Sequence, residues 1–245
     1  MKMEGFCIKI LSLCPKMWPG PLAHSLVGDA LESGVWTLDI IKIRDFATDK
    51  HKTVDAPPFG GGAGMLMRAD VVARAIDATH GCDNHPHGNT QTSREMWPLI
   101  FLSPRGKQLE QSRIRELALC RGMSLLCGRY EGVDERVLAA RGIEEISIGD
   151  FVLSGGDIAA MALVDAVVRL LPGVVGNPES LVHESFSSGL LEYPQYTRPR
   201  VWEGMTVPSV LLSGNHKEIQ SWQKKQAEHI TKERRPELWK KHCEL

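Results

Sequence analysis

Between residues 99 and 171, short apolar segments alternate with segments of helical periodicity, and this alternation restricts the fold more than any other feature of the sequence. The expected strands cover 99–102, 124–127 and 143–148, and the expected helices cover 109–120, 134–141 and 157–171. Strands that are joined through helices pair in parallel and are covered by helices on both faces. The pattern therefore predicts an α/β domain with a mostly parallel sheet.

The rest of the chain divides into an extension of this domain and a different C-terminal part. Strands at 6–13 and 36–43 and helices at 22–31 and 69–79 continue the α/β pattern, whereas 44–67 reads as a long loop and 80–94 as a polar insertion. After residue 176 the sequence is polar, and helical periodicity returns at 217–231 and again from Pro236. We expect an α/β domain over 1–175, a linker over 176–188 and a small helical domain over 189–245.

Composition restricts the location of the protein more than its function. Hydrophobic residues make up 42% of the 245 residues and the net charge is −1, so the chain as a whole has no basic character. No apolar run approaches the roughly 20 residues of a membrane helix, and no secretory cleavage site follows the start of the chain. The six cysteines include no C-x-x-C pair. These observations predict a soluble cytoplasmic protein that does not associate with membranes.

Three glycine-bearing loops are expected at the carboxyl ends of successive strands, where ligands bind in open α/β sheets. They are residues 102–106, 127–132 and 148–157. One such loop alone is explained by the geometry of a tight turn, but three in succession indicate a binding site rich in exposed backbone groups. A fourth glycine tract, 57–65, matches neither the phosphate-loop nor the dinucleotide spacing. It is either a flexible surface segment or an ordered lid, and its Pro-Pro and Met-Leu-Met flanks favour the lid.

Other kinds of site find little support. Cys82, His85 and His87 stand close together, but no second pair of ligands has a zinc-like spacing, so no metal site is predicted. No G-x-S-x-G sequence supplies a nucleophile elbow.

The loops and their flanking motifs, taken in order, resemble the bacterial tRNA (guanine-N1)-methyltransferase family of the trefoil-knotted SPOUT methyltransferases. The resemblance covers nearly the whole chain and is carried by residues 44–46, 51–55, 60–67, 127–132, 147–156, 196–199, 211–216 and 234–238. It implies a C-terminal trefoil knot in the α/β domain, which physical rules alone would not predict because threaded chains are rare. It also implies methyl transfer from S-adenosyl-L-methionine to N1 of guanine 37 in tRNA, by a homodimer whose subunits share the active site.

The resemblance also assigns residues. Those expected to hold S-adenosylmethionine, largely through backbone atoms, are Leu102, Ser103, Pro104, Gly128, Glu131, Gly132, Ile148, Gly149, Asp150, Phe151, Val152, Leu153, Gly155 and Gly156. The expected catalytic residues are Glu184, as the general base for guanine N1, and Arg169, which would stabilise charge on guanine O6. Those expected to contact tRNA are Gly60, Gly61, Gly62, Arg198, Arg200, Asn215, His216, Lys224 and Arg234. A Mg²⁺ requirement is a family expectation without a dedicated protein site.

The two catalytic assignments depend on the resemblance. Glu184 stands where the family has an aspartate, and without the resemblance it would be interpreted as a solvated linker acid. Arg169 would be interpreted as a cation at a helix C-terminus.

Two alternative functions remain at this point. One is a related knotted enzyme that methylates a ribose 2′-hydroxyl or another base. The other is a noncatalytic RNA-binding protein that retains a vestigial cofactor pocket.

Overall fold

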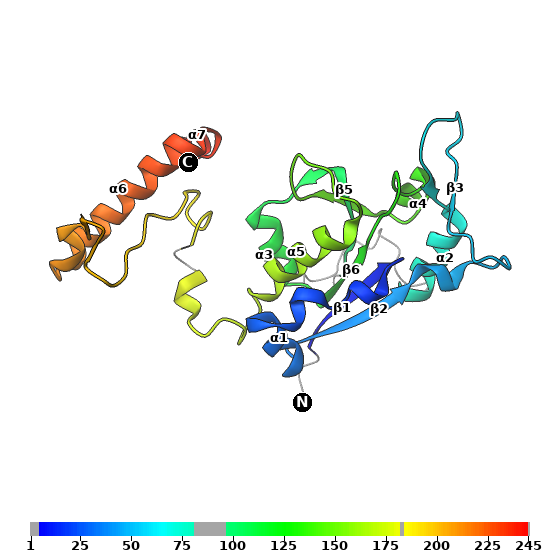
Figure 1. The fold of residues 1–245 in the computed structure, drawn as a ribbon, viewed down its shortest axis with the longest axis horizontal. Helices are drawn as coiled ribbons and strands as arrows, with labels where there is room; N and C mark the ends of the chain where they lie inside the picture. The colour runs from blue at the N-terminus through cyan, green and yellow to red at the C-terminus, as the bar shows by residue number, and fades with distance from the viewer. Residues whose placement is uncertain (1–4, 81–96, 182–183, 245) are drawn as a thin grey trace. The chain divides into compact units, whose positions relative to one another are not determined.

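The computed structural model describes residues 5–80, 97–181 and 184–244, which fall into two compact units, Met1–Gly176 and Asn177–Leu245 (Figure 1). The first unit is built around a five-stranded sheet in the order β2-β1-β6-β5-β7. Its strands are β1 (Phe6–Ser12), β2 (Trp36–Lys42), β5 (Leu99–Gln108), β6 (Gly122–Leu126) and β7 (Glu144–Ser147). Every pairing in this sheet is parallel. The predicted α/β fold with a mostly parallel sheet is thus confirmed.

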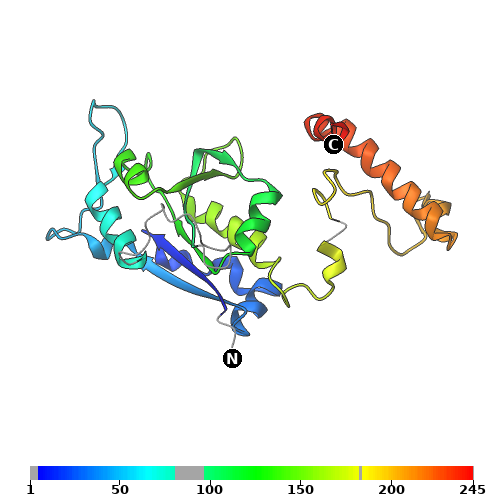
Figure 2. The same ribbon diagram turned by 180° about the vertical axis from the view of Figure 1, so that it is seen from behind.

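Helices cover both faces of this sheet, as Figures 1 and 2 show from opposite sides. The helices of the first unit are α1 (Ser25–Glu32), α2 (Ala69–His80), α3 (Gln111–Ala118), α4 (Glu135–Ala140) and α5 (Gly156–Val168). One core cluster joins the sheet to α1, α3 and α5, and a second joins it to α2 and α4. The pleat of the strands explains the division, because neighbouring side chains such as Ile10 and Leu11 of β1 point to opposite faces and enter different clusters.

The expected strand at 99–102 was too short. Strand β5 continues to Gln108, and Ile146 of β7 is aligned with both Leu102 and Lys107 of β5. Residues 103–106 therefore bulge from the strand instead of following its end. Pro104 has no backbone N–H to contribute to the ladder, and a bulge is one of the few places where a sheet accepts proline.

Other boundaries differ by a few residues. The helix expected at 22–31 is divided into a 3₁₀ turn, Gly20–Ala23, and α1, because His24 between them has extended backbone angles. The segment expected to be one loop, 44–67, contains the antiparallel pair β3 (Asp55–Ala56) and β4 (Leu66–Met67). The polar insertion expected at 80–94 lies, beyond His80, outside the described residues.

The second unit contains α6 (His216–Arg234) and α7 (Pro236–Cys243), and an antiparallel pair that the sequence analysis did not expect, β8 (Val201–Trp202) and β9 (Met205–Thr206). The hydroxyl of Thr231, buried on α6, accepts a hydrogen bond from the backbone N–H of Leu191 over 2.8 Å and so attaches the preceding segment to the helix. In the part of the chain that the structure describes, no helix has the length and apolar character needed to span a membrane.

Candidate functional site

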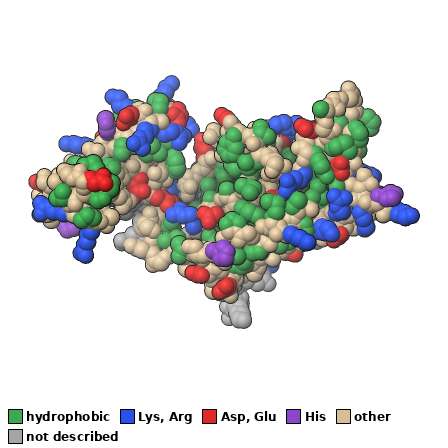
Figure 3. All heavy atoms as spheres, viewed as in Figure 1, with side chains coloured by type: hydrophobic (Ala, Val, Ile, Leu, Met, Phe, Trp, Pro, Cys, Tyr) green, Lys and Arg blue, Asp and Glu red, His purple; other side chains and the backbone are tan. Residues whose placement is uncertain are grey.

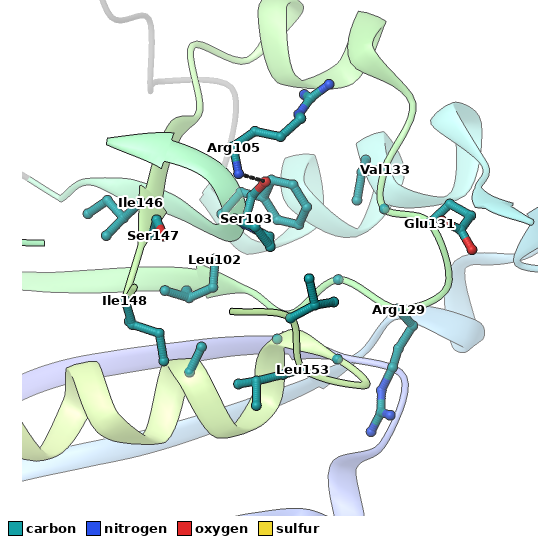
Figure 4. Close-up of a pocket in the computed structure, with 18 of the residues that line it drawn as sticks. Leu102, Ser103, Arg105, Arg129, Glu131, Val133, Ile146, Ser147, Ile148 and Leu153 are labelled. Atoms are coloured by element: carbon teal, nitrogen blue, oxygen red, sulfur yellow. Dashed lines mark hydrogen bonds between the residues drawn. The ribbon is translucent and has the colours of Figure 1, made fainter. Parts of the chain in front are cut away.

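A cavity of about 440 Å³ opens at the carboxyl edge of the parallel sheet (Figure 4). Most of its wall comes from three segments: the first part of β5 with its bulge, the loop that follows β6, and the loop that joins β7 to α5. These are the three segments at which the sequence analysis expected a ligand. Parallel pairing of β5 with both β6 and β7 brings them to one edge of the sheet.

Thirteen of the fourteen residues expected to hold a cofactor line this cavity. They are Leu102, Ser103, Pro104, Gly128, Glu131, Gly132, Ile148, Gly149, Phe151, Val152, Leu153, Gly155 and Gly156. The remaining residue, Asp150, is exposed and is not part of the cavity lining.

Ten further residues line the cavity that the sequence analysis had not assigned to it. They are Leu66, Phe101, Arg105, Arg129, Tyr130, Val133, Glu135, Ile146, Ser147 and Ala159. Phe101 and Ile146 read as ordinary core residues because they sit in apolar strand segments, and both are buried in the structure. Arg105 and Arg129 belong to loops that were interpreted through their glycines and backbone groups. The positive charge of the two side chains was the sequence feature that could have identified them as part of the site.

Glycine is required where two of these loops touch. The backbone N–H of Gly156 donates to the carbonyl oxygen of Gly128 over 2.8 Å. A Cβ atom at Gly156 would lie 2.9 Å from the backbone nitrogen of Gly128 and 3.1 Å from the Cα atom of Cys127, closer than the loops permit. Glycine at position 156 therefore lets the backbones of the two loops come into direct contact at the cavity wall.

Charged side chains stand at the rim of the cavity. The guanidinium of Arg105 lies 2.7 Å from the carboxylate of Glu135 and 3.4 Å from that of Glu145. The hydrogen bond to Glu135 raises the pKa of Arg105 above its usual range. Arg105 is 64% exposed, so this arrangement orients the guanidinium but adds little to stability.

The glycine tract is attached to the same wall through β3 and β4. The N–H of Glu131 donates to the carbonyl of Met65, and the N–H of Met67 donates to the carbonyl of Gly132, both over 2.9 Å. At Gly64, whose φ is +93°, a Cβ atom would lie 2.4 Å from the Cγ atom of Glu131. The tract is therefore hydrogen-bonded to the cavity wall on its C-terminal side.

In the described part of the chain, open space lies where side chains would stand on the three central glycines of the tract. Gly60, Gly61 and Gly62 all have positive φ and are exposed, and no atom within 4 Å would obstruct a Cβ at any of them. They do not line the cavity.

The described residues contain no cluster of three or more His, Cys, Asp or Glu side chains that could hold a metal ion. The triad Cys82, His85 and His87, considered for zinc, lies outside the described residues.

The sequence was also compared with known families and proteins. The family model for tRNA (Guanine-1)-methyltransferase TrmD matches residues 6–241. The chain belongs to this family.

Individual relatives agree with the assignment. A tRNA (guanine-N(1)-)-methyltransferase of Mesorhizobium japonicum is 57% identical over 237 residues, which are 97% of each chain. The protein of that name from Rhodospirillum rubrum is 56% identical over 95% of this chain and 92% of its own, and the one from Rhizobium etli is 53% identical over 97% of each. The resemblance identified from the motifs is confirmed, and the chain is a methyltransferase.

Within this family member, the two expected catalytic residues lie outside the cavity lining. Arg169 follows the last residue of α5, and its N–H donates to the carbonyl of Asp165 over 3.1 Å. Glu184 is half-buried in the second unit, where its carbonyl accepts a hydrogen bond from the N–H of Ser187 over 3.2 Å. Because the two residues belong to separate units, each is placed only within its own unit.

The other residues expected to contact tRNA lie in the second unit, where Lys and Arg side chains stand on the surface among acidic ones (Figure 3). Arg198, Arg200, His216, Lys224 and Arg234 are all exposed. Asn215 also has a structural role, because its side chain accepts from the N–H of Glu218 and caps α6.

Two tryptophans of the second unit, Trp222 and Trp239, are half-buried and contact aromatic neighbours of the same unit. Trp222 lies against Tyr196, with ring centroids 6.3 Å apart, and Trp239 stacks on His242 at 5.8 Å. These contacts explain both tryptophans as packing residues of the second unit.

Proposed function

We propose that this chain transfers a methyl group from S-adenosyl-L-methionine to N1 of guanine 37 in tRNA, the nucleotide 3′ of the anticodon. The observation that carries the proposal is the family match over residues 6–241, within which the bulge of β5 and the loops after β6 and β7 line one cavity. The related knotted enzymes with other targets and the noncatalytic RNA-binding protein are the alternatives that the experiments below separate from it.

The cavity has the chemistry that S-adenosylmethionine requires. Its volume of about 440 Å³ falls within the usual range for small-molecule sites, roughly 300–1,000 Å³. Leu102, Ile148 and Leu153 supply an apolar surface for the adenine ring, while the glycine loops expose N–H and C=O groups for its polar edge and the ribose. S-adenosylmethionine, once bound, supplies an electrophilic methyl group on its sulfonium sulfur.

The protein's own residues then have to prepare guanine as a nucleophile. Guanine N1 carries a proton and attacks poorly until that proton leaves, so a general base is needed. We assign this role to the carboxylate of Glu184, which would take the proton from N1. We assign to Arg169 the stabilisation of negative charge that develops on guanine O6. Glutamate in place of the family's aspartate keeps the carboxylate and lengthens its reach by one methylene.

The second unit is assigned to tRNA binding, and Gly60, Gly61 and Gly62 are assigned to contacts near the target base. This assignment uses the expected division into a domain over 1–175, a linker over 176–188 and a helical domain over 189–245. Arg198, Arg200, His216, Lys224 and Arg234 are exposed there and would neutralise phosphates, with Asn215 beside them.

A homodimer with a shared active site and a trefoil knot are part of the same proposal. Leu26 of α1 and Ile158 of α5 are 51% and 53% exposed, and both helices pack on the 3₁₀ turn Gly20–Ala23, which supports an interface on that face. The knot is proposed from the family match alone. Mg²⁺ would act with the tRNA, and the cytoplasm is the compartment that this substrate predicts.

Replacing Glu184 with Gln tests the proposed chemistry. The amide cannot accept the N1 proton, so single-turnover methyl transfer should fall by about 10²- to 10⁴-fold. Calorimetric binding of S-adenosylmethionine to the same variant should remain at the wild-type affinity. Wild-type turnover by Glu184→Gln would remove Glu184 as the base. Failure of the wild-type protein to bind S-adenosylmethionine would contradict the proposed function as a whole.

A further inference from the structure

Arg129 leaves the loop after β6 and runs along the cavity wall to a buried acid. In Figure 4 its side chain extends away from Arg105 and Ser103, which lie on the opposite wall. Its Nη2 atom lies 3.3 Å from Oδ2 of Asp157, and Nη1 donates to the carbonyl of Ser154 over 3.3 Å. The same Nη2 atom lies 3.2 Å from the sulfur atoms of Cys14 and Met17. One side chain therefore links the loop after β6 to the loop before α5 and to the segment after β1.

Asp157 is the centre of this arrangement. It is 1% exposed and stands in the first turn of α5. Its Oδ1 atom accepts hydrogen bonds from Ser12 Oγ over 2.5 Å and from Trp18 Nε1 over 3.1 Å. The N-terminus of a helix favours a carboxylate, but a buried carboxylate also needs a cation nearby, and Arg129 supplies it.

The loops are shaped around this ion pair. A Cβ atom at Gly155 would lie 2.6 Å from Cδ and Nε of Arg129, so glycine at that position lets the arginine side chain pass. The neighbouring Gly156 makes the direct backbone hydrogen bond to Gly128. Gly128, Gly155 and Gly156 all line the cavity, so a shift of Arg129 would change the spacing of groups that face a ligand.

We propose that Arg129 and Asp157 are positioning residues for methyl transfer: their buried ion pair holds the loops 128–132 and 148–156 at the spacing that S-adenosylmethionine requires. The inference rests on the proposed function for the identity of the ligand. It assigns the pair a task beyond stability, because the groups that the pair holds in place are those that form the cavity wall.

Variants of each partner separate positioning from stability. Arg129→Met removes the cation and leaves Asp157 buried without it, so both stability and cofactor affinity should fall. Asp157→Asn keeps an oxygen that can accept from Ser12 and Trp18 but loses the charge. In the double variant Arg129→Met with Asp157→Asn no buried charge is left uncompensated, so thermal stability should recover towards the wild-type value. The loops would still lack their connection, and S-adenosylmethionine affinity should remain about 10- to 100-fold below wild type.

Arg113→Met is the matched control. Arg113 is 27% exposed against 22% for Arg129 and lies 2.6 Å from Glu144, but Glu144 is 37% exposed where Asp157 is 1% exposed, and neither Arg113 nor Glu144 lines the cavity. This variant should lose stability and keep wild-type affinity. Arg129→Lys retains the charge with fewer donors and should show an intermediate affinity, which gives a milder variant if Arg129→Met does not fold.

The measurements are thermal unfolding, calorimetric titration with S-adenosylmethionine, and backbone amide hydrogen exchange of the unliganded protein. Exchange at 128–132 and 148–156 should be faster in Arg129→Met and in the double variant, and unchanged in Arg113→Met. Hydrogen exchange needs no ligand, so it tests the positioning role even if the wild-type protein binds another cofactor. Unchanged exchange in both loops, or an affinity that recovers with stability in the double variant, would overturn the inference. Absence of S-adenosylmethionine binding by the wild-type protein would instead contradict the proposed function.

Discussion

Gly156 and Gly128 face each other across the cavity wall, with the N–H of Gly156 2.8 Å from the carbonyl oxygen of Gly128. This hydrogen bond connects the first residue of α5 to the loop that follows β6, two segments that the fold brings together at one edge of the sheet. The contact leaves no room for a side chain at Gly156.

Gly156→Ala should weaken S-adenosylmethionine binding by about tenfold or more, because the new methyl group forces the two loops apart. Overpacking of this kind should also cost about 1–3 kcal/mol of stability. Calorimetric titration and thermal unfolding measure the two effects. Gly176→Ala is the control, since a Cβ at Gly176 meets nothing within 4 Å. Equal affinities for Gly156→Ala and wild type would show that the loop contact does not shape the site.

Gly64→Ala should reduce methyl transfer through Glu131. Its Cβ would lie 2.4 Å from Glu131 Cγ, and its positive φ adds backbone strain of about 1–2 kcal/mol. Gly34→Ala carries similar strain, with a φ of +76° in open space and remote from the cavity lining. A single-turnover assay compares the methyl-transfer rates of the two variants. Equal rates for Gly64→Ala and Gly34→Ala would show that the contact between Gly64 and Glu131 does not affect methyl transfer.

Asp134 should make the stability of the first unit depend on pH. Its side chain caps α4 by accepting from the N–H of Arg136 over 3.0 Å, and the hydrogen bond from the Arg136 guanidinium lowers the pKa of Asp134. A carboxyl whose pKa is depressed in the folded state stabilises the protein above its unfolded pKa, and the contribution is lost as pH falls through the folded value. Asp134→Ala should therefore cost about 1 kcal/mol at neutral pH and less under acid conditions.

The matched variant for this prediction is Asp134→Asn. Asparagine caps helices as well as aspartate does but does not titrate, so it should keep most of the stability and lose this part of the pH dependence. Urea unfolding at neutral and acid pH measures both variants. An Asp134→Ala cost that is the same at both pH values would contradict the assignment.

Arg200→Gln should weaken the binding of tRNA whatever the nucleotide sequence. The slope of log affinity against log salt concentration should become shallower by about 1, as expected for the loss of one phosphate contact. Arg200 is exposed beside β8. Arg115→Gln on α3 removes an exposed arginine from the first unit and should leave the slope unchanged. Filter binding across a salt series gives both slopes. The same slope for Arg200→Gln and wild type would remove Arg200 from the tRNA surface.

The sheet could be predicted because its strands are short apolar segments that alternate with helical ones. The bulge at 103–106 could not, because it depends on the alignment of Ile146 with both Leu102 and Lys107, a pairing across the sheet that no local pattern contains. The strands β8 and β9 escaped prediction for a different reason. They have two residues each, too few to show an alternation.

The sequence motifs predicted the part of the cavity lining that the glycine-bearing loops form. The role of Arg129 could not, because it depends on partners that are close only in the folded chain: Cys14 lies 115 residues earlier in the sequence. Glu184 and Arg169 were assigned by resemblance alone, and that assignment remains a prediction. Their separation into two units explains why the geometry of one unit does not test it.

The most direct test of the account is transfer of labelled methyl from S-adenosylmethionine to tRNA transcripts that carry either guanine or adenine at position 37. Label is expected in the guanine transcript only, at N1 of nucleotide 37. Label at a ribose 2′-hydroxyl or at another base, or no transfer to either transcript, would contradict it.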